Sequence, residues 1–253
     1  MKYVLGLVGD AGAGKDTFAD MAKVWAWEVL GPEYSISKFS FAAPVYELAA
    51  VILGVTPEKL AERRTKEIKQ WFWVTQEALE RTANVWKRFG IDKYADFPYV
   101  WPQFEASTLY PLIAKTTPDF YQGHETPLYP LYTSPRKMLE FVGTELGRAL
   151  VDENLWLNIV VDRITATKAD ISIISDVRFD NEAALVRNFP GAQNSSILKV
   201  HAPNNIHAIQ STHASARGVA PEFIDDVVTN NFDGLENFRK NVNAFCDERI
   251  LFI

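Results

Sequence analysis

A short apolar run that ends in a glycine-rich turn with a lysine constrains this fold more than any other feature of the sequence. Residues 3–8 are almost entirely apolar, as in a strand that is buried on both faces. The next residues match Gly-x4-Gly-Lys from Gly9 to Lys15, and helical spacing of apolar residues follows through Leu30. A strand, a glycine loop and a helix in this order are typical of a phosphate-binding loop.

Each residue type in this loop has a physical role in holding a phosphorylated donor. Gly12 and Gly14 allow tight turns that bring backbone N–H groups to phosphate oxygens, and Lys15 adds a point charge. Asp16 stands where a serine or threonine would hold magnesium, and Thr17 follows one position later. We predict that Asp16 and Thr17 serve a magnesium ion or its water ligands. The alternative for Asp16 is an acidic first-turn residue that the helix dipole favours.

Strands and helices alternate elsewhere in the chain. Strands are predicted at 36–41, 171–175, 197–200 and 227–229, and helices at 44–53, 181–188 and 235–245. This alternation predicts an α/β fold with a parallel sheet and helices on both faces. Residues 71–132 hold 15 of the 32 aromatic residues in about a quarter of the chain. We therefore predict one domain over residues 1–253, in which 71–133 is a mainly helical insertion over the ligand edge of the sheet.

Composition excludes several classes of protein. The formal net charge of -6 over 253 residues argues against a general nucleic-acid binder, which normally carries a basic face. The one cysteine, Cys246, stands among apolar residues and is expected to be buried. We see no run of 18 apolar residues and no signal-peptide pattern, so we expect a cytoplasmic protein without a membrane segment.

Residues 134–148, SPRKMLEFVGTELGR, predict a helix that carries a second anion site. Ser134 is a plausible N-cap. Arg136 and Lys137 fall in the first turn, where cations oppose the helix dipole, and a bound anion would offset that cost. Gly143 in a helix interior costs up to about 1 kcal/mol against alanine, which indicates that another group approaches closely. The alternative is a solvated polar stripe formed by Arg136, Glu140, Thr144 and Arg148.

A carboxylate follows the predicted strand at 171–175. Asp176 ends that strand, at the edge where open α/β sheets bind their ligands. Arg178 is placed to neutralise charge on a transferring group, Asn181 to cap the next helix, and Glu182 in its first turn. The alternative is a surface pair between Arg178 and Glu182.

Taken in order, these segments resemble the deoxynucleoside monophosphate kinases of bacteriophages. The resemblance covers about two-thirds of the chain and includes a Gly-Lys-Asp-Thr loop, an arginine-rich helix entry followed by Gly-Thr, a downstream tryptophan and an Asp-x-Arg-x-x-x-Glu stretch. The residues that match are Gly14 to Thr17, then Arg136, Lys137, Gly143 and Thr144, then Trp156, and finally Asp176, Arg178 and Glu182.

The resemblance implies transfer of the γ-phosphoryl group of ATP, with Mg2+, to a deoxynucleoside monophosphate. Lys15 would hold the donor phosphates, and Arg136 with Lys137 the acceptor phosphate. Arg178 would stabilise the transferring group, while Asp16 and Asp176 organise magnesium or acceptor. The positive groups at 15 and 136 are thus expected to face one site.

Other residues are implied in substrate binding with less definite roles. Gly143, Thr144 and Glu182 belong to the substrate-binding motifs, and Trp156 either contacts the base or ribose or is a plain core residue. The Thr212–His213 loop also resembles the family, although Ala216 departs from the glutamate frequent there. His213 is expected to form a hydrogen bond within its loop, and the alternative is that the loop borders the nucleotide base. The basic run Arg63, Arg64, Lys66 and Lys69 is either a lid contact or a solvated helix face.

Two alternatives remain open for the function. One is another small-molecule P-loop kinase of the dephospho-coenzyme A or sugar kinase type. The other is a nucleotide-binding module without catalysis, which leaves Arg136, Lys137 and Arg178 unexplained. The expected partners are small nucleotides, with no nucleic-acid polymer and no membrane, and a homodimer is compatible with the aromatic surplus.

Overall fold

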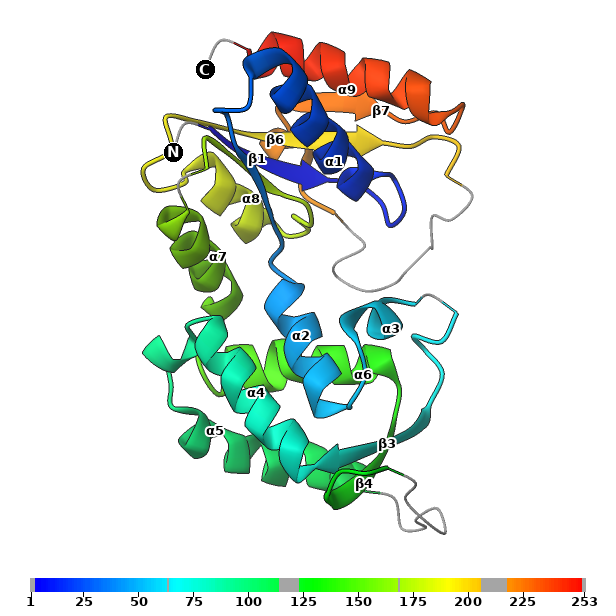
Figure 1. Ribbon diagram of the computed structural model, residues 1–253, viewed down its shortest axis with the longest axis vertical. Helices are drawn as coiled ribbons and strands as arrows, with labels where there is room; N and C mark the ends of the chain where they lie inside the picture. The colour runs from blue at the N-terminus through cyan, green and yellow to red at the C-terminus, as the bar shows by residue number, and fades with distance from the viewer. Residues whose placement is uncertain (1–2, 63, 114–122, 168, 206–217, 252–253) are drawn as a thin grey trace. The chain divides into compact units, whose positions relative to one another are not determined.

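The computed structural model describes residues 3–62, 64–113, 123–167, 169–205 and 218–251. The chain forms two compact units, the first comprising Met1–Phe41 with Val160–Ile253 and the second Ala42–Ile159 (Figure 1). The predicted insertion at 71–133 is part of the second unit, which extends beyond it at both ends. Predictions for Arg63 and for the loop with Thr212, His213 and Ala216 lie outside the described residues.

The first unit is built on a five-stranded sheet. Its strands are β1 (Tyr3–Val8), β2 (Ile36–Phe39), β5 (Ile171–Ile174), β6 (Asn194–His201) and β7 (Asp226–Thr229). Their order is β2-β5-β1-β6-β7, and every neighbouring pair is parallel. The parallel sheet predicted from the alternation of elements is therefore confirmed. Strands β2 and β5 lie on one side of β1, and β6 and β7 lie on the other. The strand order therefore reverses at β1, and open α/β sheets bind their ligands at the carboxyl end of such a switch point.

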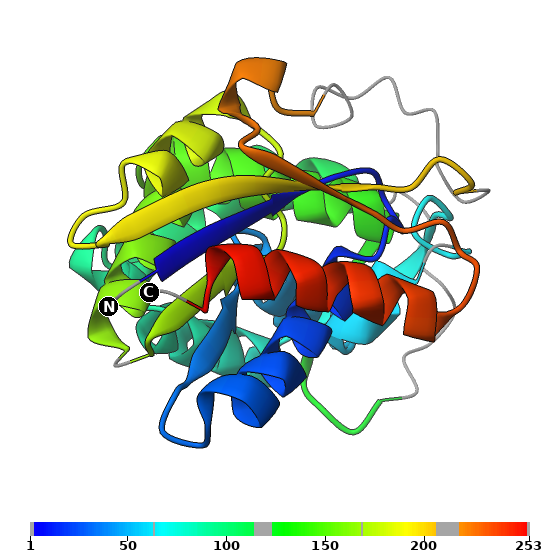
Figure 2. The same ribbon diagram turned by 90° about the horizontal axis from the view of Figure 1, so that it is seen from above.

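Helices cover both faces of this sheet, as predicted (Figure 2). On one face lie α1 (Lys15–Trp25), its π-helical continuation η1 (Ala26–Leu30) and α9 (Leu235–Arg249). Leu5 and Leu7 of β1 share a buried cluster with Phe18 and Phe245 from these helices. On the other face, α8 (Asp180–Arg187) packs against Gly6, where an added Cβ would meet the side chain of Val186 at 3.2 Å. A 3-10 turn, η7 (Pro221–Phe223), precedes β7.

Two side-chain predictions for this unit have opposite outcomes. Cys246 is fully buried, as predicted, and burial raises the pKa of its thiol to about 12. The helical spacing of Phe18, Ala22, Trp25 and Val29 predicts that they share one apolar side, but Val29 is 49% exposed. The prediction for Val29 is wrong because the helix widens to π geometry from Ala26, and the wider turns rotate the later residues away from the α-helical face.

The second unit is mainly helical and also contains two paired strands. Its helices are α2 (Ala43–Ile52), α3 (Pro57–Ala61), α4 (Gln76–Arg88), η2 (Ile91–Lys93), α5 (Phe97–Phe104), η3 (Glu105–Leu109), η4 (Tyr110–Leu112), α6 (Pro135–Glu140) and η5 (Phe141–Ala149). The helix α7 (Leu155–Ala166) begins in this unit and ends in the first. Strands β3 (Gln70–Thr75) and β4 (Pro127–Thr133) pair antiparallel, whereas no strand was predicted in this part of the sequence.

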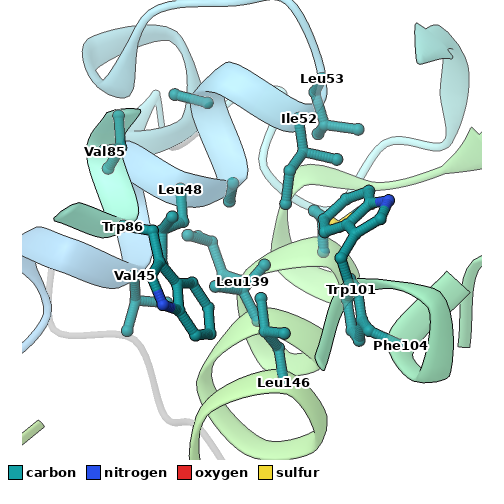
Figure 3. Packing of buried hydrophobic residues seen from close by; sticks show 14 of the residues in the cluster. Val45, Leu48, Ile52, Leu53, Val85, Trp86, Trp101, Phe104, Leu139 and Leu146 are labelled. Carbon is teal, nitrogen blue, oxygen red and sulfur yellow. The ribbon is translucent and has the colours of Figure 1, made fainter. Parts of the chain in front are cut away.

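Aromatic side chains form the core of the second unit. Trp86, Phe97, Trp101 and Phe104 contact one another in sequence, with ring centroids 5.6, 5.4 and 5.7 Å apart. Leucines from α2 and α6, together with Leu146 of η5, fill the space between them (Figure 3). The aromatic surplus of the insertion is therefore used largely as packing, since each such ring buries a large apolar area.

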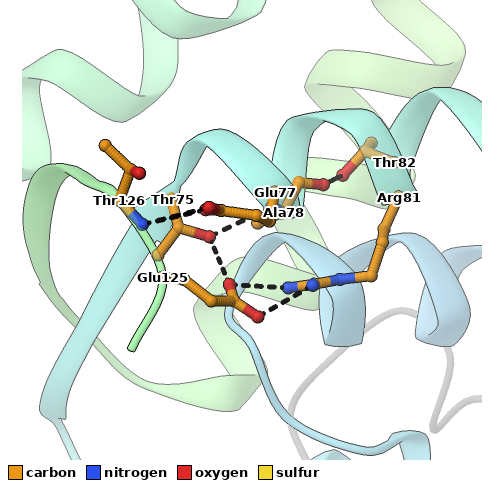
Figure 4. A network of polar contacts seen from close by, with 7 residues as sticks. All are labelled: Thr75, Glu77, Ala78, Arg81, Thr82, Glu125 and Thr126. Atoms are coloured by element: carbon orange, nitrogen blue, oxygen red, sulfur yellow. Dashed lines mark hydrogen bonds and ion pairs between the residues drawn. The ribbon is translucent and has the colours of Figure 1, made fainter. Parts of the chain in front are cut away.

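A network of hydrogen bonds links the end of β3 and the first turns of α4 to Glu125, just before β4 (Figure 4). The Thr75 hydroxyl caps α4 by accepting a hydrogen bond from the Ala78 N–H at 3.0 Å, and it donates to Glu125 at 2.6 Å. Arg81 donates two hydrogen bonds to the Glu125 carboxylate, at 2.8 and 2.9 Å. Arg81 first, and Thr75 second, lower the pKa of Glu125 to about 2.

This network predicts an acid-sensitive contribution to stability. Because folding lowers the pKa of Glu125, its contribution is fully present above the unfolded pKa of about 4.3 and is lost as the pH falls towards about 2. Glu125→Gln should therefore lower the midpoint of thermal unfolding at pH 6 by a few degrees at most, since solvent screens the exposed pair. The difference from wild type should shrink between pH 5 and pH 3 in a series of melts. A difference that is the same at every pH would contradict this account.

Candidate functional site

The loop between β1 and α1 has the backbone geometry that its glycines predict. Gly14 adopts φ 101°, and an added Cβ would lie 2.8 Å from the Asn230 amide nitrogen. Gly9 adopts φ 146°, and its Cβ would lie 2.5 Å from the carbonyl oxygen of Val200. These values exclude larger residues at both positions. Gly12 is also in the left-handed region, with φ 83°.

Two asparagines outside the loop, neither of which was predicted, hold it by hydrogen bonds to its backbone. The amide of Asn230, directly after β7, donates to the carbonyl oxygen of Ala13 at 3.0 Å and is buried. The amide of Asn205 donates to the carbonyl oxygen of Ala11, also at 3.0 Å. Asn230 comes directly after the last residue of β7, at the carboxyl edge of the sheet where ligand sites form. This position in the sequence is the signal by which it could have been predicted as a site residue.

Lys15 folds back across the loop. Its ammonium group donates hydrogen bonds to the carbonyl oxygens of Gly9 at 2.6 Å and Asp10 at 3.0 Å. The lysine is largely buried, and burial is the main reason why its pKa lies below the ordinary value. A partly desolvated ammonium group that is held only by neutral carbonyl oxygens is well suited to bind phosphate. A phosphate oxygen carries negative charge and therefore compensates the ammonium group for its lost hydration better than a carbonyl does.

The structure brings further predicted residues into the electrostatic range of Lys15. After burial, repulsion by Arg178 is the next cause of its lowered pKa, while Asp16, Asp10 and Asp176 act in the opposite direction. Within the described residues, no carboxylate forms an ion pair with the exposed Arg178 guanidinium. Two close cations without full compensation create a local preference for an anion.

Asp176 is held by the chain that follows β2. Its two carboxylate oxygens accept hydrogen bonds from the Ser40 hydroxyl at 2.7 Å and from the Phe41 N–H at 2.8 Å. Phe41 is the last residue of the first unit before the chain enters the second. Asp176 therefore fixes the exit of β2 as well as contributing charge near Lys15, a second role that the sequence did not indicate.

Asp16 and Thr17 begin α1 beside the loop. The Asp16 side chain is 77% exposed, and it forms an ion pair of 3.4 Å with Lys38 of β2. Lys38 also pairs with Asp20 at 3.1 Å. These exposed pairs are worth little energy, so Asp16 can exchange Lys38 for another cation at small cost.

Glu182 is buried beneath its turn rather than exposed on the surface. Its carboxylate accepts hydrogen bonds from the backbone N–H groups of Arg178 at 2.7 Å and Phe179 at 3.2 Å. This capping arrangement argues against the alternative of a surface pair with Arg178. It also replaces the predicted N-cap at Asn181, because α8 begins at Asp180 and its N-cap residue is Phe179. Glu182 is thus a support for the turn that carries Arg178.

The predicted second anion site lies in the other unit. Ser134 caps α6 by accepting a hydrogen bond from the Lys137 N–H at 3.3 Å, as predicted. The Arg136 side chain, about one-third exposed, donates to the Glu67 carboxylate at 2.9 Å. Lys137 pairs with Glu140 at 3.3 Å and lies over the Phe141 ring, while Thr144 is exposed. The prediction that residues 15 and 136 face one site concerns both units and stays a prediction.

The close approach of another group that was expected at Gly143 is found instead at Gly147, against the Trp156 ring. An added Cβ at Gly143 would meet only the Val45 side chain, at 3.7 Å, whereas one at Gly147 would lie 2.1 Å from the Trp156 ring. Trp156 is 3% exposed and donates its indole N–H to the carbonyl oxygen of Gly143 at 2.8 Å. Trp156 is therefore packed in the core of the second unit, as one of the two interpretations from the sequence expected.

This geometry predicts opposite outcomes for two alanine substitutions. Gly147→Ala should lower the free energy of unfolding by about 1–3 kcal/mol, because the new methyl group overlaps the Trp156 ring. Gly143→Ala should be neutral or stabilise by up to about 1 kcal/mol, because its methyl group has room. Urea unfolding of both variants checks this, and equal effects would contradict the assignment of the close contact to Gly147.

This fold and site define a P-loop phosphate-binding α/β protein. The glycine loop and Lys15 follow the central strand β1, and Asp176 and Arg178 follow the neighbouring strand β5. A model of the deoxynucleotide monophosphate kinase family matches residues 131–242. The deoxynucleoside-5'-monophosphate kinase of Escherichia phage T5 is 46% identical over 250 residues, covering 98% of this chain and 97% of that protein. The chain belongs to the deoxynucleoside monophosphate kinase family. Among the described residues, no helix is long and apolar enough to cross a membrane.

Proposed function

We propose that the protein transfers the γ-phosphoryl group of ATP to a deoxynucleoside 5'-monophosphate, giving the diphosphate and ADP. Membership of the kinase family supports a phosphotransfer reaction between small nucleotides. The observation that carries the proposal is the charge arrangement around Lys15, where Arg178 and three carboxylates lie within electrostatic range of a partly buried ammonium group. Phosphoryl transfer requires mainly positioning and charge stabilisation of this kind.

On the donor side, Lys15 and the loop of Gly12 and Gly14 bind the ATP phosphates. Lys15 exchanges its carbonyl partners for phosphate oxygens, which are stronger, charge-assisted acceptors. Arg178 neutralises charge on the transferring group, and Glu182 holds the backbone of that arginine in place. In this proposal the buried glutamate contributes to catalysis indirectly, through the turn that it caps.

The residues beside the loop fit a magnesium ion that accompanies ATP. Asp16 is exposed and only weakly paired, Thr17 offers a hydroxyl in the first turn of α1, and Asp176 contributes negative charge near Lys15. Oxygen groups of this type suit Mg2+, which keeps several waters and phosphate oxygens as ligands. Asp16, Thr17 and Asp176 would hold such an ion directly or through water, and it would supply positive charge to the phosphates.

On the acceptor side, Arg136 binds the 5'-phosphate, with Lys137, Gly143 and Thr144 nearby in sequence. The Arg136–Glu67 pair has a carboxylate partner that is 67% exposed, so little energy is lost when a phosphate dianion replaces it. The absence of a nucleic-acid partner and the homodimer both stay predictions.

We further propose that residues 71–133 cover the acceptor during turnover, because water must be excluded to prevent ATP hydrolysis. Backbone hydrogen exchange of this segment should slow when a non-hydrolysable ATP analogue and a deoxynucleoside monophosphate are added together. Exchange that is unchanged by the pair of ligands would remove the covering role.

The decisive experiment is a coupled assay of ADP release across the four deoxynucleoside monophosphates, ribonucleotides, sugars and dephospho-coenzyme A. We expect release that depends on at least one deoxynucleoside monophosphate. Activity only with a sugar or with dephospho-coenzyme A would identify a different small-molecule kinase. ATP binding without release for any acceptor would indicate a non-catalytic nucleotide-binding module.

A further inference from the structure

Lys66 lies directly beside Arg136, although 70 positions separate them in the sequence. The Lys66 carbonyl oxygen accepts a hydrogen bond of 2.9 Å from the Arg136 N–H, in the first turn of α6. Residues 64–67 form a turn rather than the solvated helix face predicted for this basic run, and Lys66 is partly buried there. The contact fixes the backbone positions of two cationic residues next to each other.

The Lys66 ammonium group has a definite position set by α2. It donates a hydrogen bond to the Tyr46 hydroxyl and lies 4.9 Å from the centre of the Tyr46 ring. Tyr46 itself packs against the buried core of the second unit, which limits its movement. A phenol hydroxyl and a ring face orient an ammonium group without neutralising its charge.

The neighbouring carboxylates are engaged with other partners. Glu62 accepts hydrogen bonds from Lys59 at 2.8 Å and from the Thr65 hydroxyl at 3.2 Å. Glu67 pairs with Arg136 at 2.9 Å. Across the described ranges, Lys66 forms no ion pair with a carboxylate. A partly buried charge without a counterion is costly unless a ligand supplies the opposite charge.

Lys137, the residue expected from the sequence to assist Arg136, is situated differently. Its ammonium group lies along its own helix, paired with Glu140 at 3.3 Å and 4.6 Å from the centre of the Phe141 ring. Among the residues that the structure describes, Lys66 has no such competing acid, and its backbone carbonyl is hydrogen-bonded to the Arg136 N–H. The geometry therefore favours Lys66 over Lys137 as the second cation beside Arg136.

We propose that Lys66 binds the 5'-phosphate of the acceptor nucleotide together with Arg136, and that Tyr46 is the positioning residue for its ammonium group. This inference rests on the proposed function, because it takes the phosphate at Arg136 to be that of the acceptor. The ligand class is a nucleoside monophosphate, recognised through its terminal dianion by one planar and one point cation.

The test compares Lys66→Met, Tyr46→Phe and, as a matched control, Lys69→Met from the same segment, where the lysine is exposed. Calorimetry without ATP measures the Kd of the preferred deoxynucleoside monophosphate and of the deoxynucleoside that lacks the phosphate. We expect Lys66→Met to weaken monophosphate binding by about 10- to 100-fold, the loss typical of a charged hydrogen bond. Tyr46→Phe should cause a smaller loss, about three- to tenfold, and Lys69→Met no more than about twofold.

Deoxynucleoside affinity and the KM for ATP should stay unchanged in all three variants, since neither involves the acceptor phosphate. Equal weakening of monophosphate and deoxynucleoside would show that Lys66 only supports the fold, and unchanged monophosphate affinity would also overturn the inference. If Lys66→Met does not fold, Lys66→Gln and Tyr46→Phe provide the same comparison. Wild-type protein that binds monophosphate but releases no ADP would refute the proposed function, and the Kd values would still decide the role of Lys66.

Discussion

Replacing Lys15 by alanine should lower kcat by about 10²–10³-fold, the loss typical of removing one preorganised donor from a charged transition state. The ammonium group is partly desolvated and already held at the loop by two carbonyl oxygens, so no rearrangement of the backbone is needed before it meets a phosphate. Steady-state assays with saturating ATP and acceptor measure the change. We expect kcat to fall more than the affinity for the acceptor, because the lysine acts on the donor phosphates.

The matched control is Lys23→Ala, an exposed lysine in the last turn of the same helix. It removes the same charge from α1 without touching the loop, and it should leave kcat within about twofold of wild type while costing about 0.3–1 kcal/mol of stability at most. Both variants should retain a cooperative thermal transition. Near-wild-type turnover in Lys15→Ala would remove this lysine from the proposed mechanism.

Local signals in the sequence were sufficient for the phosphate loop and the sheet. Gly9, Gly14 and Lys15 lie within seven consecutive residues, and the strand before them and the helix after them have clear periodicity. The structure confirms the predicted parallel sheet, whose central strands β1 and β5 are visible in the sequence as short, mainly apolar runs. Positions that depend on neighbours close in sequence were therefore predictable.

Contacts between distant segments could not be predicted in this way. The close packing of Trp156 against Gly147 depends on how η5 and α7 pack, whereas the cost of a glycine in a helix interior had pointed to Gly143. No strand was predicted at β3 or β4, and in β4 the residues Pro127 and Pro130 disfavour one. Proline is tolerated there because a two-stranded sheet leaves one edge of each strand unpaired. The run of Trp71, Phe72 and Trp73 was the overlooked signal for β3, since aromatic residues favour strands.

Arg136→Ala should also lower turnover by about 10²–10³-fold, with a rise in the KM for the acceptor and little change in the KM for ATP. Its guanidinium presents a planar pair of donors that a phosphate can occupy, and its present partner, Glu67, is exposed. Glu67→Gln should therefore leave activity intact or improve acceptor affinity, because it removes the competing carboxylate. Steady-state kinetics over a range of acceptor concentrations separates these effects.

Arg88→Ala is the matched control for Arg136→Ala, because Arg88 is likewise an arginine of the second unit paired with a glutamate, Glu47. If an exposed ion pair were all that mattered, the two variants would lose equal and small amounts of stability and no activity. If residues 15 and 136 act on one pair of nucleotides, an inhibitor that joins ATP to a deoxynucleoside through their phosphates should bind more weakly to both Lys15→Ala and Arg136→Ala. Weakening by only one of these substitutions would refute that convergence, and with it the transfer of a phosphoryl group between the two sites.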